Sequence, residues 1–211
     1  MMRALYSSAT GMMAQELQID TISNNLANVN TTGFKKVRVN FQDLIYQTMR
    51  NAGTPTSAGT QIPNPIQVGL GTKAASTQRL FSAGEYQQTD NPLDMLIEGD
   101  GFFQITMPDG TISYTRDGSF KMDSQGKVVT SDGYSLSPEI TIPANALSIN
   151  ISNDGTVSVI SPGAVDPQNI GQLTLARFIN PGGLESMGKN LFRNTAASGE
   201  AITNTPGLEG F

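Results

Sequence analysis

Five Asp-Gly pairs punctuate the chain between residues 100 and 155, and they constrain its fold more than any other feature. The pairs are Asp100-Gly101, Asp109-Gly110, Asp117-Gly118, Asp132-Gly133 and Asp154-Gly155. The short runs between them are β-branched or alternate in polarity, which is typical of strands. An Asp-Gly pair readily supplies the positive-φ residues of a type I′ hairpin turn. The sequence therefore predicts an antiparallel β domain, built from hairpins, over residues 70–205.

The N-terminal region has a different pattern, which predicts a helix over residues 1–30. Apolar residues recur on one side of this helix, and we take them as candidate packing residues: Leu5, Met12, Ile19, Ile22 and Leu26. The stripe is as narrow as a coiled-coil seam, and no second helical pattern of this kind follows. An ordinary core helix is the alternative interpretation. The predicted fold class is mainly β with an N-terminal α-helix, an antiparallel β domain plus a long axial helix of the coiled-coil type.

Residues 31–69 are predicted to connect the helix to the β domain. Gly33 suits a left-handed cap at the end of the helix. The spacing of Phe41, Leu44, Ile45 and Met49 predicts a short second helix. Residues 51–65 are rich in Gly, Pro, Thr and Asn, which indicates an extended or mobile segment.

Composition excludes several kinds of chemistry. The 211 residues include no Cys, His or Trp, so a Ser-His-Asp triad, a cysteine nucleophile and an imidazole or thiolate zinc site are ruled out. The net charge of −5 disfavours a nucleic-acid partner. The N-terminal apolar residues form no run of about 7–15, as in a signal peptide, or about 20, as in a membrane span. We expect no catalytic residue, no cofactor, no metal and no membrane insertion.

One acidic run leaves an enzymatic alternative open. It contains Asp90, Asp94, Glu98 and Asp100, and a pair of carboxylates is the machinery of glycoside hydrolysis. Aromatic residues that would line a sugar cleft are sparse, since they make up 7% of the chain. Solvated turns and strand ends are therefore the favoured interpretation of these acids.

Residues 23–36 read SNNLANVNTTGFKK, and this segment resembles the signature of the flagellar axial family, the rod and hook proteins of the bacterial flagellum. The resemblance continues through EGDGFFQI, YTRDGSF, GQLTLARF and NLFRNTAASG, so it covers nearly the whole chain. The signature positions that match are Asn24, Asn25, Ala27, Asn28, Asn30, Thr31, Gly33, Phe34 and Lys35.

The resemblance implies a structural subunit, not an enzyme, whose copies stack into the rigid hollow rod that carries torque from motor to hook. The helix would bury its stripe against neighbouring helices, and residues 1–35 would become ordered only on polymerisation, because a lone helix of this kind is marginal in water. Residues 40–72 resemble a stretch specific to subunits of the distal rod, expected to stiffen the shaft. The candidate residues of this stretch are Tyr46, Met49, Pro55, Pro63 and Pro65.

The same resemblance implies the partners. These are copies of the chain itself in a homopolymer, the proximal rod proteins, the hook-side proteins, the surrounding basal-body rings and the flagellar export apparatus. Export without a cleaved signal would place the protein in the part of the basal body that spans the periplasm. Family members end in a second long helix, so residues 206–211 are expected to begin a return towards such a helix outside this sequence. A proximal rod subunit is one alternative, and an enzyme acting on peptidoglycan through Asp94 and Glu98 is another.

Overall fold

The computed structural model describes residues 2–53, 55–57, 60–163 and 166–207, without the side chains of residues 55–57 and 60–61. Two compact units make up the chain. Unit 1 comprises residues 1–29 and 36–80, and unit 2 comprises residues 30–35 and 81–211. Within the described ranges the helix is confined to the N-terminal region and antiparallel strands follow it. The predicted class, mainly β with an N-terminal α-helix, is confirmed.

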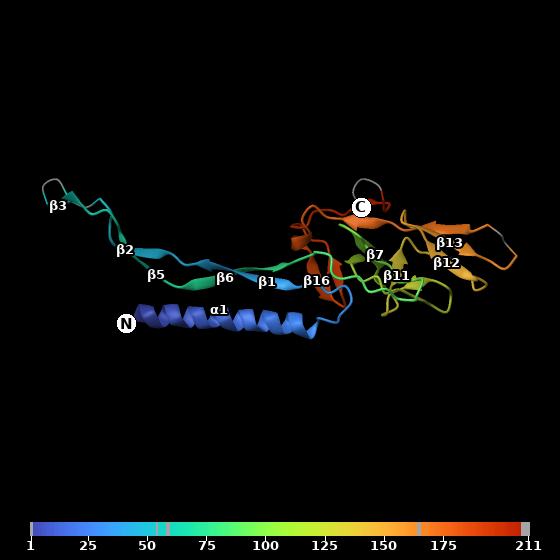
Figure 1. The fold of residues 1–211 in the computed structure, drawn as a ribbon, viewed down its shortest axis with the longest axis horizontal. Coiled ribbons are helices and arrows are strands. Elements are labelled where there is room, and N and C mark those ends of the chain that lie inside the picture. The colour runs from blue at the N-terminus through green and yellow to red at the C-terminus, as the bar shows by residue number, and fades with distance from the viewer. Residues whose placement is uncertain (1, 54, 58–59, 164–165, 208–211) are drawn as a thin grey trace. The chain divides into compact units, whose positions relative to one another are not determined.

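Unit 1 consists of one helix and one long antiparallel hairpin. The helix α1 runs alongside β1 and β6, and the hairpin continues past them through β2 and β5 to β3 and β4 (Figure 1). No described residue of unit 1 is a buried hydrophobic residue. The elements are α1 (Met2–Ala27), β1 (Val37–Asp43), β2 (Tyr46–Arg50), β3 (Pro55–Ser57), β4 (Thr60–Gln61), β5 (Ile66–Gly69) and β6 (Thr72–Arg79).

The hairpin corrects the prediction of a short second helix over Phe41–Met49. That stretch lies in β1 and β2, which pair with β6 and β5 across about 20 to 40 residues of sequence. Between the two strands, the backbone N–H of Leu44 donates to the carbonyl oxygen of Gly71 at 2.9 Å. Pairing with a distant strand outweighs the local helical spacing, because it satisfies the backbone hydrogen-bonding groups of both segments.

The boundary between the two units falls after Leu80, whereas the β domain was predicted to start at residue 70. Residues 72–79 form β6, which pairs with β1 and therefore belongs to unit 1. Unit 2 takes up the chain again at Phe81, and it also includes residues 30–35, that is, the last residue of the predicted helical region and the first five of the predicted connector. Of the predicted return segment 206–211, residues 208–211 lie outside the described residues.

The described residues of unit 2 form two sheets. The larger follows the order β16-β17-β8-β7-β11-β10-β9, with β15 joined to both β7 and β18, and the smaller follows β12-β13-β14. Its elements are β7 (Phe102–Thr106), β8 (Ile112–Thr115), β9 (Lys121–Met122), β10 (Val128–Val129), β11 (Ser135–Ser137), β12 (Ser148–Ile151), β13 (Thr156–Ile160), β14 (Gln168–Gln172), β15 (Leu175–Arg177), the 3-10 turn η1 (Pro181–Gly183), β16 (Glu185–Gly188), β17 (Leu191–Arg193) and β18 (Ile202–Asn204).

Alternating strand residues of both sheets give unit 2 a hydrophobic core. One cluster is mainly aliphatic and includes Ile105, Leu136 and Val159. A second cluster is aromatic, and its rings meet edge to face around Phe102, with Phe178 at 5.7 Å and Phe81 at 5.3 Å between centroids. This geometry favours aromatic pairs because the positive edge of one ring meets the negative face of the next.

Three of the five Asp-Gly pairs form hairpin turns, but not of the predicted type. Gly110, Gly133 and Gly155 have φ of 81°, 85° and 74° between successive strands, whereas the preceding Asp residues do not have positive φ. Such loops are type I turns followed by a left-handed glycine, the usual three-residue hairpin connection. The two-residue hairpin loop with positive φ at both positions is instead Lys189-Asn190, at 54° and 58° between β16 and β17.

Candidate functional site

The predicted packing stripe of α1 lies on the outside of unit 1. Its five side chains, from Leu5 to Leu26, are each 55–70% exposed, and Met2, Met13 and Val29 are exposed as well. Because soluble monomers rarely leave a contiguous apolar surface uncovered, such a surface marks an interaction site. The stripe is therefore available for packing against another molecule.

The opposite face of α1 packs on the hairpin of unit 1, and apart from Leu17 its half-buried residues are small or polar. Ser7, Thr10, Ala14 and Thr21 on this face are half-buried. The hydroxyl of Thr10 accepts from the backbone N–H of Thr72 at 3.4 Å and donates to the carbonyl of Ser7 at 2.9 Å. A Cβ at Gly71 would lie 2.3 Å from this hydroxyl oxygen, so the glycine permits the close approach. The helix thus directs a face of mostly small and polar residues into the unit and keeps its apolar stripe outside.

This orientation determines the energetics of the helix. Complete burial of one Leu, Ile or Met side chain stabilises by about 1.5–3 kcal/mol. Within unit 1 the five stripe residues gain little of this stabilisation, since each stays more than half exposed. A partner surface that covered all five would supply several kcal/mol per helix. No helix in the described part of the chain is long and apolar enough to span a bilayer.

The first half of the signature segment, residues 23–29, connects the end of α1 to the hairpin by hydrogen bonds. The side chain of Asn25 forms two hydrogen bonds with the backbone of Val37: its Nδ2 donates to the carbonyl oxygen at 2.8 Å, and its Oδ1 accepts from the N–H at 2.9 Å. The Asn28 side chain donates to the carbonyl of Asn24 at 2.9 Å, and this carbonyl also accepts from the backbone N–H of Asn28 at 3.2 Å, so two hydrogen bonds converge on it at the helix end. Asn25 therefore acts like one residue of a neighbouring strand beside β1.

The second half, residues 30–35, lies against unit 2. Gly33 has φ of 72°, and a Cβ there would lie 2.8 Å from the Cα of Asp117, so only glycine fits without displacing the backbone. The side chain of Asn190 donates to the carbonyl oxygen of Thr32 at 2.8 Å, and Lys35 Nζ donates to the carbonyl of Ser82 at 2.7 Å. We call this arrangement the signature seat. Phe34 is half-buried, whereas Asn30 and Thr31 are exposed.

Two cations lie close together at the signature seat. Burial lowers the pKa of Lys35, and the positive charge of Arg116 lowers it further. The Arg116 side chain is only 5% exposed, and its Cζ lies 5.1 Å from the ring centroid of Phe102. Its Nη2 forms an ion pair with Oδ1 of Asp100 at 3.6 Å. Burial lowers the pKa of Arg116 as well, and Asp100 opposes that effect. The seat therefore stabilises the backbone of residues 30–35 at some electrostatic cost.

The segment predicted to be specific to the rod forms the outer hairpin, β2–β5 and β3–β4. The ring of Tyr46 lies over Gly69 on the paired strand, where a Cβ would come within 3.3 Å of it. The pairing register skips Met49, which is 65% exposed at this bulge. Pro63 and Pro65 are exposed between β4 and β5, and Pro55 begins β3, with its side chain outside the described residues. The segment is extended, as predicted, but its strands are paired.

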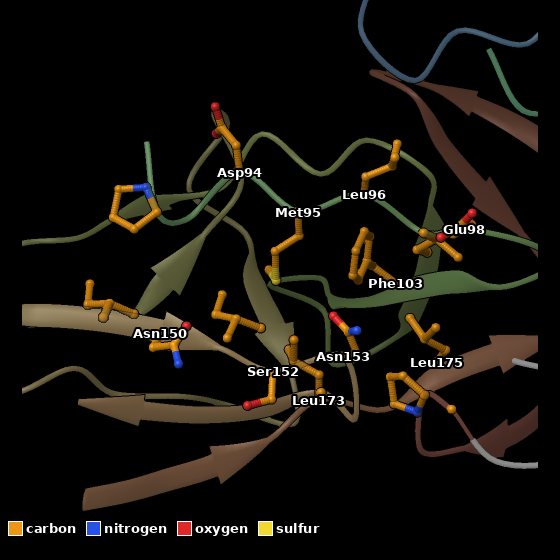
Figure 2. A pocket seen from close by; sticks show the side chains of 17 residues that line it. Asp94, Met95, Leu96, Glu98, Phe103, Asn150, Ser152, Asn153, Leu173 and Leu175 are labelled. Atoms are coloured by element: carbon orange, nitrogen blue, oxygen red, sulfur yellow. The ribbon is translucent and has the colours of Figure 1, made fainter. Parts of the chain in front are cut away.

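The acidic run borders a groove in unit 2 with a volume of about 590 Å³. Its floor reaches the buried side chains of Phe103, Leu173 and Leu175. Figure 2 shows Asp94 and Glu98 at separate places on the rim, pointing outward, with Met95 and Phe103 in the centre. Asp94 accepts hydrogen bonds from Thr89 and Asn91 at 2.7 and 2.8 Å, so it organises a turn. Nothing in this geometry supports the carboxylate pair of a glycosidase.

The residues that hold the signature segment in unit 2 could not be identified from the sequence pattern. Asp117 and Arg116 lie in the block YTRDGSF, and Asn190 begins the block NLFRNTAASG. Both blocks contributed to the family resemblance, but neither the seat for Gly33 nor the bond to Thr32 follows from spacing along the chain. The groove floor around Leu173 was missed for the same reason.

Comparison with known proteins agrees with this arrangement. The family described as "Flagella basal body rod protein" matches residues 5–35, and that described as "Flagellar hook protein FlgE/F/G D1 domain" matches residues 96–159. The flagellar basal-body rod protein FlgG of Borreliella burgdorferi is 54% identical over 212 residues, covering 100% of this chain and 80% of that protein. FlgG of Caulobacter vibrioides is 50% identical over 211 residues, with the same coverage. The hook protein FlgE of Helicobacter mustelae is 47% identical, but over 64% of this chain and 30% of its own length.

A β unit with its own core, joined to an amphipathic helix whose apolar face is uncovered, defines a structural protein of the kind that builds larger assemblies. This chain belongs to the family of flagellar basal-body rod proteins. The resemblance found in the sequence, and the expectation of a structural subunit of the flagellar rod, are confirmed.

Proposed function

We propose that this chain is a structural subunit of the distal part of the flagellar rod, and that the exposed stripe of α1 packs against the α1 helices of neighbouring copies. The observation that carries the proposal is the orientation of α1. Its small and polar face is used inside unit 1, and its apolar residues, such as Met12 and Ile19, remain exposed. A helix with this arrangement gains most of its burial free energy only in an assembly.

The signature segment has a positioning role in this proposal. Asn25 holds the end of α1 on β1, and Gly33 and Lys35 hold the chain on unit 2. Neither group of contacts uses the exposed stripe, so the fold of each unit leaves that surface free for other subunits. The outer hairpin, which contains Met49, is the proposed stiffening element. Its described side chains form no core of their own and include exposed apolar residues that neighbouring subunits can contact.

The location and partners of the protein follow from the same proposal. Its relatives are named as basal-body rod proteins, which places this chain in the basal body with other rod components. The finer assignments are contacts with proximal rod proteins, hook-side proteins and the surrounding rings, and export through the flagellar apparatus without a cleaved signal into the part of the rod that spans the periplasm.

The test is an Ile19→Asp substitution in the full chain. A carboxylate in the helix interface would be buried without a partner, so polymerisation is expected to be lost. The thermal unfolding of unit 2 should not change, since Ile19 is 61% exposed in unit 1. Gln18→Asp, an exposed position beside the stripe, is the matched control and should assemble. Sedimentation and electron microscopy measure the polymer, and normal assembly of the Ile19→Asp protein would contradict the proposal.

A further inference from the structure

The outer hairpin of unit 1 presents a small apolar and basic surface. Met49 is skipped by the strand register and is 65% exposed, and its neighbour Arg50 is exposed as well. A bulge of this kind bends a strand and turns the side chain out of the ladder. The Tyr46 ring, in contrast, lies on Gly69 within the hairpin. Met49 and Arg50 together form what we call the arm knob.

Within the described part of residues 44–69, Arg50 is the only charged side chain, and no ion pair involves it. The arm knob is therefore a cation beside an apolar side chain, carried on a ribbon of two strands. Neither side chain of the knob is buried within unit 1.

The groove of unit 2 has the complementary character. Among its described lining residues the charged side chains are Asp94 and Glu98, both acidic and both on the rim. The carboxylate of Glu98 is exposed and takes part in no ion pair within the described ranges. The rim also presents Leu96, which is 66% exposed, above a floor that includes the buried Leu173.

One wall of the groove is formed by β12, which is an edge strand of the three-stranded sheet. An edge strand presents backbone N–H and C=O groups that a further strand can pair with. An acidic, apolar groove beside an open strand edge thus fits a basic, apolar strand, whereas a small anionic ligand would meet like charges on the rim.

We infer that this groove receives the arm knob of a second copy of the chain. Met49 enters the apolar groove beside Leu96, and Arg50 pairs with Glu98 on the rim. The inference rests on the proposed function in that it requires copies of the chain to associate. It deepens that proposal by naming the surface on which the stiffening hairpin of one subunit rests.

The test uses disulfide cross-linking, which is specific here because the chain has no cysteine of its own. Two single variants of the full chain, Met49→Cys and Leu96→Cys, are mixed under conditions that allow association and are then oxidised. A covalent dimer between the two variants is expected, with the bond located by mass spectrometry. The control mixture pairs Met49→Cys with Ile179→Cys, since Ile179 is 84% exposed, lies outside the groove, and is more accessible to random collision than Leu96.

The charges provide a second measurement. Arg50→Glu in one partner is expected to lower the yield of the dimer by about two- to fivefold, as for an exposed ion pair, and Glu98→Arg in the other partner should restore it. A yield no higher than that of the Ile179 control would overturn the inference. That result, obtained with a protein that still polymerises through α1, would leave the proposed function standing. Loss of polymerisation in the unsubstituted protein would instead count against the proposed function.

Discussion

Unit 1 and unit 2 are both built from antiparallel strands, yet among the residues that the structure describes only those of unit 2 form a hydrophobic core. In unit 2 the strand residues bury two hydrophobic clusters, one around Ile105 and Leu136 and the other around Phe102. In unit 1 the described residues contain no buried hydrophobic side chain, and apolar residues such as Leu5 and Met49 face outward. The difference shows that the same chain contains one region stabilised by its own packing and another whose apolar surface is covered only by other molecules.

The largest effect that we expect concerns the core of unit 2. Phe102→Ala removes a ring that is 1% exposed and lies at the centre of the aromatic cluster, so the free energy of unfolding should fall by about 3–5 kcal/mol. The matched change in unit 1, Leu5→Ala, should alter the stability of the monomer by less than about 0.5 kcal/mol. Urea denaturation followed by circular dichroism measures both. Equal losses for the two variants would remove the distinction between the units.

A smaller effect is expected at the signature seat. Gly33→Ala places a Cβ in a left-handed conformation, which costs about 1–2 kcal/mol, and it also presses on the backbone of Asp117. Gly110→Ala is the matched control, because Gly110 has φ of 81° and no atom within 4 Å of the added Cβ. Unfolding of unit 2 should therefore be destabilised more by Gly33→Ala than by Gly110→Ala. Identical losses would mean that the seat contributes nothing beyond the cost of the dihedral angle.

The smallest effect is a pH dependence at the same seat. The pKa of Lys35 is lowered from 10.5 in the folded protein, so the native state binds fewer protons than the unfolded state between that lowered value and 10.5. Stability from this group therefore rises with pH across that window. Lys35→Met should give a flatter dependence of the unfolding free energy on pH than the unsubstituted protein, and Lys36→Met, at an exposed position, should not.

The buried tyrosine Tyr114, whose pKa is raised, acts in the opposite direction at alkaline pH, but it is common to all three proteins and cancels in the comparison. Urea titrations at several pH values between 8 and 10.5 provide the measurement. A slope for the Lys35→Met protein equal to that of the unsubstituted protein would show that the charge of Arg116 and the burial of Lys35 do not affect folding.

The sequence predicted the parts of the fold that depend on local patterns. The helix was expected over residues 1–30 and spans Met2–Ala27, and hairpin turns occur at Gly110, Gly133 and Gly155. The turn type was wrong, because the preceding Asp residues keep negative φ and only the glycines are left-handed. The local signal thus located the turns without specifying their geometry.

The hairpin of unit 1 was not predictable in the same way. Its strands pair residues far apart in the sequence, as Phe41 does with Ala74, and periodicity within one segment carries no information about such a partner. Helical spacing at Phe41, Leu44 and Met49 therefore gave the wrong element. The seat for Gly33 on Asp117 and the groove beneath Met95 are likewise formed by tertiary contacts, and composition indicated neither.

The proposed roles of the signature and stripe residues depend on the difference between the two units. Sequence reasoning identified Leu5, Met12, Ile19, Ile22 and Leu26 as one surface, and the structure places all five on the exposed side of α1. What the pattern alone did not indicate is that the opposite, polar face, with Thr10 and Asn25, would be the one used inside the unit. The apolar face is thus available because the polar face satisfies the contacts of the monomer.

The central claim is that α1 gains most of its stabilisation from other copies of the chain. Amide hydrogen exchange, measured residue by residue in the monomer and in the polymer, tests it most directly. The account predicts rapid exchange over residues 5–26 in the monomer, while the strands of unit 2 such as β7 remain protected, and strong protection of the same helical amides in the polymer. Strong protection of residues 5–26 in the monomer would contradict the account.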